Sequence, residues 1–126
     1  MNQTLRRSGM LDPKSPRHLV VLTTVSSEEV ARTLVHGLVG DRLIACGTIF
    51  GPARSIYRWE GQVIEDDETV IIMKTPSDRW EALRAAIQDR HPYEVPELLA
   101  LPVWDGLDAY LRWVTQSTRE GETITP

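Results

Sequence analysis

The sequence lacks the features that mark disulfide-bonded, nucleic-acid-binding, secreted or membrane-spanning proteins. Cys46 is its only cysteine among 126 residues, which excludes an intrachain disulfide and fits a reducing compartment. Its 14 basic residues are outnumbered by 18 acidic ones, so it lacks the basic excess typical of nucleic-acid-binding domains. No apolar run approaches the roughly 18 residues of a membrane span, and residues 1–17 hold no apolar signal segment. We therefore expect a cytoplasmic protein with neither a membrane nor a nucleic-acid partner.

Motifs that carry catalysis or metal binding are also missing. The chain has no G-x-S-x-G, no phosphate-binding glycine loop and no H-E-x-x-H. Besides the cysteine, the candidate metal donors His18, His36 and His91 show no metal-binding spacing. These absences favour a protein without catalytic activity that requires no cofactor. Because catalytic groups can meet only in space, an enzyme using His91 and Glu97 as acid and base remains an alternative.

The apolar pattern predicts one α+β domain over residues 18–114, between polar tails at 1–17 and 115–126. Strands are expected at 18–24, 43–49, 54–59, 63–64, 69–75 and 97–104, and helices at 26–40, 75–90 and from 105 onward. Pro102 favours an edge position or a bulge for the last strand.

Three residues are expected to cap these helices. Ser26 forms a capping box with Glu29, Thr75 precedes a proline at the first helical position, and Asp105 begins the last helix.

This order is β-α-β-β-α-β with an additional C-terminal helix, the split β-α-β arrangement of ferredoxin-like folds. Right-handed crossovers place both crossover helices on one face of the sheet. The opposite face must then be covered by something else.

The central hairpin is too long for one compact subunit. Residues 43–59 would extend roughly 55 Å at ~3.3 Å per residue, whereas a domain of this size measures about 35 Å across. The hairpin must bend at Gly51-Pro52, project, or do both. A projecting arm that carries Ile56, Tyr57 and Trp59 would be protected by pairing with other copies. The alternative is a short hairpin with an ordered loop at 50–55.

Several long segments occur in the order found in one known family. They are Leu43-Ile44-Ala45-Cys46, Ser55-Ile56-Tyr57-Arg58-Trp59-Glu60-Gly61, Lys74-Thr75, His91-Pro92-Tyr93-Glu94-Val95-Pro96-Glu97 and Tyr110-Leu111-Arg112-Trp113. With them the chain resembles the CutA family of divalent-cation tolerance proteins from about residue 19 to 114. One departure follows the cysteine, where Gly47-Thr48 replaces the family's common Val-Asn pair.

The resemblance implies a homotrimer of ferredoxin-like subunits, similar in architecture to the PII signalling proteins. It also implies a link to copper tolerance and to binding of copper or another divalent cation, with no catalysed reaction. The alternative function is a PII-like sensor of a small ligand, with pockets between subunits.

Two sets of residues are candidates for a site. Cys46 and His91 are the candidate metal ligands, because a thiolate suits Cu(I), although a lone cysteine in an apolar strand is often a small buried hydrophobe. A pocket at a subunit seam would be lined by Tyr57, Trp59, Lys74, Tyr93, Glu94 and Glu97. The aromatic residues could equally serve interface packing, and Lys74 could form an ion pair with Glu94 or Glu97. The acidic run at 65–68 is expected to be a solvated flank of the hairpin.

Overall fold

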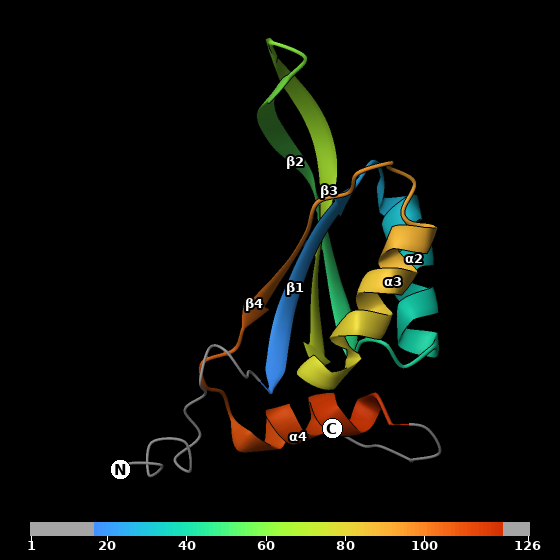
Figure 1. Cartoon of the computed structure of the whole chain (residues 1–126), viewed down its shortest axis with the longest axis vertical. Helices are drawn as coiled ribbons and strands as arrows, with labels where there is room; N and C mark the ends of the chain where they lie inside the picture. The colour runs from blue at the N-terminus through green and yellow to red at the C-terminus, as the bar shows by residue number, and fades with distance from the viewer. Residues whose placement is uncertain (1–16, 120–126) are drawn as a thin grey trace.

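The computed structural model describes residues 17–119, which form an α+β domain (Figure 1). The elements are β1 (His18–Val25), α2 (Glu28–Gly40), β2 (Cys46–Trp59), β3 (Gln62–Pro76), the 3-10 turn η1 (Ser77–Arg79), α3 (Trp80–Arg90), β4 (Leu98–Pro102) and α4 (Asp108–Ser117). This confirms the predicted fold class, including the C-terminal helix.

The predicted tails fall largely outside the described residues, which begin at Arg17 and end at Arg119. Helix α4 continues through Ser117, past the boundary expected at residue 115, and the following Thr118 is fully buried.

The four strands form one antiparallel sheet in the order β2-β3-β1-β4. Helices α2 and α3 cover one face (Figure 1). Alternate side chains of the central strands, among them Val21, Ile71 and Met73, are fully buried against these helices because successive residues of a strand point to opposite faces. Strand β4 lies at the edge, which confirms the edge position expected from Pro102.

The opposite face of the sheet, here called the open face, carries apolar side chains without a covering layer among the described residues. Val20 pairs with Leu101 and Leu22 with Leu99 across β1 and β4. Leu99 and Leu101 remain 54% and 45% exposed. Helix α4 crosses only the end of the sheet at which β1 begins and β3 ends (Figure 1).

The hairpin of β2 and β3 is continuous and long. Its register runs from Cys46 opposite Lys74 to Trp59 opposite Gln62, with one irregularity between Phe50 and Ala53. Its turn end projects beyond the other two strands (Figure 1). The break expected at Gly51-Pro52 is therefore a bulge within a single strand, and the alternative of a loop at 50–55 is wrong.

The cap of α2 differs from the prediction by one residue. Ser27, not Ser26, is the N-cap, and its Oγ accepts a hydrogen bond from the Val30 amide at 3.2 Å. Both serines have cap-forming side chains, so composition alone does not choose between them.

The predicted caps of the other two helices are wrong. The Thr75 hydroxyl faces the interior and donates to the Leu43 carbonyl at 2.7 Å, and the 3-10 turn η1 intervenes before α3 begins. The Asp105 carboxylate accepts from the Gly106 amide, and α4 begins three residues later with no side-chain cap.

Candidate functional site

Cys46 is the first residue of β2 and lies on the open face beside Tyr110 of α4. Its Sγ is 3.7 Å from the Tyr110 hydroxyl oxygen, and the thiol is half-buried rather than sealed in the core. Burial raises the pKa of Tyr110 to about 12, with the neighbouring Cys46 adding to the shift. The phenol therefore keeps its proton at neutral pH and can donate a hydrogen bond to the sulfur.

Tyr110 is the partner that sequence reasoning missed. Its ring also contacts Trp113, with ring centroids 5.7 Å apart. The sequence motifs include Tyr110 only in the segment at 110–113, and it is 64 positions from Cys46 along the chain. No local pattern connects residues at that separation.

His91 lies at the end of α3 with both ring nitrogens occupied. Its Nδ1 accepts a hydrogen bond from the Tyr93 amide at 3.1 Å. Its Nε2 lies 2.8 Å from the Thr24 carbonyl oxygen, which can only accept, so Nε2 carries the hydrogen. The side chain is only 6% exposed and its ring lies 4.8 Å from that of Tyr93. No ring lone pair is left to bind a metal ion, and His91 fits a structural role.

One chain does not bring Cys46 and His91 together. Cys46 pairs with Lys74, whereas the Thr24 that His91 contacts pairs with Val70. Lys74 and Val70 lie four positions apart on β3, which separates the two pairs by ~13 Å along the strand. Residues 17–119 also contain no group of three or more His, Cys, Asp or Glu side chains placed to hold a metal ion.

Two of the predicted pocket residues share the same acidic surroundings at the hairpin. The Tyr57 hydroxyl donates to the Asp66 carboxylate, and this bond is the main cause that raises the pKa of Tyr57. Burial, followed by the charges of Glu68 and Asp66, raises the pKa of Tyr93. The acidic run is therefore more than a solvated flank, because it contributes hydrogen-bonding and charged partners to both phenols. We call Tyr57, Asp66, Glu68 and Tyr93 the tyrosine–carboxylate cluster.

The other predicted pocket residues are dispersed. Trp59 is 60% exposed near the turn of the hairpin, and Lys74 lies on the sheet beside Cys46. Glu94 is exposed, and Glu97 contributes its backbone carbonyl to the Thr23 hydroxyl at 2.6 Å.

The expected ion pair of Lys74 with Glu94 or Glu97 does not form. Among the described residues, every ion pair contains an arginine. The glutamates lie in or beside the connection between α3 and β4, whereas Lys74 lies near the end of β3.

Two hollows of the surface lie away from the predicted pocket. One, of about 340 Å³, lies beside α4 and is lined by residues that include His18, Leu111 and Thr115. The other, of about 460 Å³, lies between α2 and α3. Neither is lined by any residue that the sequence predicted for the pocket.

Known proteins resemble the chain over this whole domain. The family model described as CutA1 divalent ion tolerance protein matches residues 19–117. The chain belongs to the CutA1 family. The divalent-cation tolerance protein CutA of Thermus thermophilus is 46% identical over 99 residues, which cover 79% of this chain and 96% of that protein. The chloroplastic CutA protein of Arabidopsis thaliana is 39% identical over 106 residues, covering 84% of this chain and 58% of its own length.

Solved CutA1 structures agree with the fold. The structure from Oryza sativa has a TM-score of 0.80 at 36% identity and covers 85% of this chain and 98% of its own. That from Thermus thermophilus has a TM-score of 0.78 at 45% identity and covers 81% and 99%. The resemblance to CutA is thus confirmed. Within the part of this CutA1 chain that the structure describes, no helix has the length and apolar character needed to cross a bilayer.

Proposed function

We propose that this CutA1 chain works in the cytoplasm as a homotrimer that binds copper or another divalent cation and catalyses no reaction. The metal donors come from more than one subunit, with Cys46 as the thiol donor. The apolar open face of the sheet is the single observation that carries the proposal, because it requires a cover that residues 17–119 do not supply.

Exposed apolar side chains continue along the hairpin, and they support the proposed homotrimer. Ile56 is 63% exposed, and Trp59 and Val63 are similarly open to solvent. The projecting arm also presents strand edges, which natural proteins normally pair or cover. Contact with neighbouring copies would bury both the arm and the open face.

The metal part of the proposal is supported by chemistry and by the relatives. A half-buried thiol is a suitable ligand for Cu(I), and the relatives carry the name divalent-cation tolerance protein. A single described chain gathers too few donors for a closed site. Donors from several subunits would complete it.

The assembly is tested by introducing charge on the open face. Leu101→Glu should convert the protein to a monomer in light scattering, because three carboxylates would be buried at the interface. Val39→Glu is the matched control, since Val39 is a comparably exposed apolar residue on α2. A Leu101→Glu protein with the mass of the unchanged chain would contradict the proposed interface.

The metal site is tested by calorimetry with Cu(I) and Cu(II). Cys46→Ser should lose tight binding of Cu(I), whereas His36→Ala, on the exposed face of α2, should retain it. Identical isotherms for Cys46→Ser and the unchanged protein would remove Cys46 from the site.

A small-ligand sensor is the second candidate function, and the tyrosine–carboxylate cluster favours it. Its phenols and carboxylates offer hydrogen bonds and negative charge at the projecting hairpin. Thermal stabilisation by one member of a panel of cationic metabolites, lost in Tyr57→Phe, would support this function. A flat response across the panel would argue against it.

A further inference from the structure

The connection between α3 and β4, residues 91–97, is tied to the end of β1 by two hydrogen bonds. His91 Nε2 donates to the Thr24 carbonyl at 2.8 Å. The Thr23 hydroxyl donates to the Glu97 carbonyl at 2.6 Å. His91, Thr23 and Thr24 are all buried by their own chain. Both ends of the connection are therefore fixed to the sheet, whether or not other copies cover the open face.

The same connection brings Tyr93 to the base of the projecting hairpin. His91 Nδ1 accepts a hydrogen bond from the Tyr93 amide at 3.1 Å, and the two rings lie 4.8 Å apart. His91 thus contacts both the backbone and the ring of this tyrosine. In Figure 1 the connection crosses the hairpin where its turn end begins to project. There burial, followed by the charges of Glu68 and Asp66, raises the pKa of Tyr93.

The other phenol of the tyrosine–carboxylate cluster is held without the connection. Tyr57 lies on β2 opposite Ile64 of β3, and its hydroxyl donates to the Asp66 carboxylate of the same hairpin. That hydrogen bond is the main cause of its raised pKa. The cluster therefore consists of three residues of the hairpin and one, Tyr93, that a separate segment supplies.

We propose that His91 is a positioning residue, which holds Tyr93 beside the hairpin carboxylates and thereby completes the tyrosine–carboxylate cluster. Thr23 assists by fixing the far end of the connection at Glu97. A binding group is placed accurately only when hydrogen bonds and packing around it lock its conformation. The inference deepens the second candidate function and rests on it only for the use of the cluster, because the positioning itself needs no ligand.

Titration of the tyrosine phenols in the whole protein, followed by NMR of ring-labelled tyrosine, tests the proposal directly. The chain has only three tyrosines, so each signal can be assigned by substituting that residue with phenylalanine. In His91→Ala the pKa of Tyr93 should fall toward its ordinary value of 10.0. The pKa of Tyr57 should change much less, because its hydrogen bond to Asp66 lies within the hairpin.

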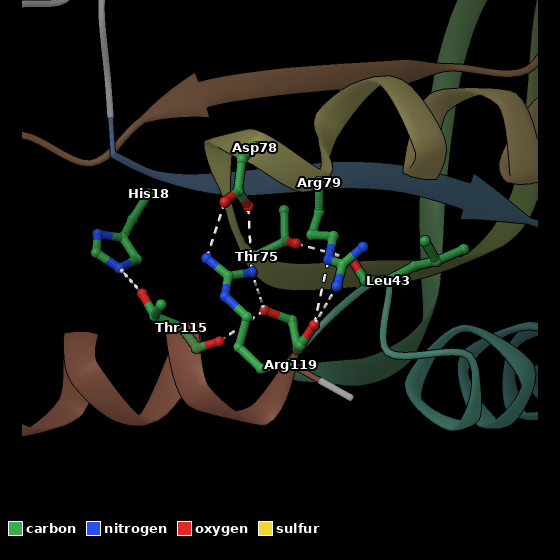
Figure 2. A network of polar contacts seen from close by, with 8 residues as sticks. His18, Leu43, Thr75, Asp78, Arg79, Thr115 and Arg119 are labelled. Carbon is green, nitrogen blue, oxygen red and sulfur yellow. Dashed lines mark hydrogen bonds and ion pairs between the residues drawn. The ribbon is translucent and has the colours of Figure 1, made fainter. Parts of the chain in front are cut away.

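Tyr110 is an internal reference for the same titration. It lies on α4, which crosses the opposite end of the sheet from the connection (Figure 1). A separate polar network holds that helix. Arg79 donates to the Thr118 carbonyl at 2.6 Å, and Arg119 forms an ion pair with Asp78 (Figure 2). The pKa of Tyr110, about 12, should therefore be the same in every variant.

Conservative variants distinguish positioning from general damage. The side-chain nitrogen of glutamine reaches as far as Nε2 of histidine, so His91→Gln should keep the bond to the Thr24 carbonyl and the raised pKa of Tyr93. Asparagine reaches only as far as Nδ1, so His91→Asn should lose both. Thr23→Val removes the second tie and tests the proposal even if His91→Ala does not fold; it should lower the pKa of Tyr93 by a smaller amount. His36→Ala, on the exposed face of α2, is the matched control and should shift neither phenol.

The proposal is overturned if Tyr93 keeps its raised pKa in both His91→Ala and Thr23→Val, because other contacts, such as those with neighbouring copies, would then hold it. Equal shifts of Tyr57 and Tyr93, or a His91→Gln protein that behaves like His91→Ala, would also overturn it. Failure of the sensor function is a separate result. It would be seen as a flat response to the metabolite panel in a protein whose Tyr93 still depends on His91.

Discussion

The substitution His91→Ala separates a structural role for this residue from a role in metal binding. His91 is buried and connects the end of α3 to β1 through the Thr24 carbonyl and to the following turn through the Tyr93 amide. Losing two hydrogen bonds of about 1 kcal/mol each and a ring contact of about 0.5–1.5 kcal/mol gives a destabilisation of about 3 kcal/mol. The affinity for copper should stay unchanged, because neither ring nitrogen is available to a metal ion.

Urea unfolding followed by tryptophan fluorescence measures the stability, and calorimetry measures copper binding. All variants must be compared at one subunit concentration, because association with other copies changes apparent stability. His36→Ala is the control, and because this histidine is exposed its effect should stay within about 0.5 kcal/mol. A His91→Ala protein of normal stability that has lost copper affinity would refute the reasoning.

Two further predictions concern a pair of glycines and a histidine. A methyl group added at Gly47 would lie 2.9 Å from a Val35 methyl carbon, so Gly47→Ala should cost about 1–3 kcal/mol in urea unfolding. Gly40→Ala, where the added carbon meets nothing within 4 Å, should instead stabilise α2 by up to about 1 kcal/mol; equal effects at both positions would contradict the packing argument. Burial lowers the pKa of His18 below its ordinary 6.5, so the unfolded chain takes up a proton more readily than the folded one. Stability should therefore fall as the pH drops below about 6.5 and less so in His18→Gln; an equal fall in both proteins, measured by urea unfolding across this range, would exclude His18 as the cause.

The element order was predictable because each element carries its own local period. Val21 lies within a short apolar run rich in β-branched residues at 18–24, whereas Leu34 and Leu38 repeat at helical spacing, so strand and helix could be distinguished from residue types alone. The projecting hairpin followed from chain length. Its continuity through Gly51-Pro52 did not, because a bulge at that position depends on the register of β3.

The candidate site was less predictable because its contacts join distant residues. Whether His91 is free to bind a metal depends on the Thr24 carbonyl, which is 67 positions away. The same holds for Tyr110 beside Cys46. Thr75 has the sequence context of a cap. Its hydroxyl instead donates to the Leu43 carbonyl in the interior, because strand alternation points the side chain toward the core.

The open face and the projecting arm make assembly the central claim, and the mass of the protein in solution tests it most directly. Light scattering on the full chain should give three times the 14.3 kDa of one subunit. A mass of 14.3 kDa at micromolar concentration would contradict the account.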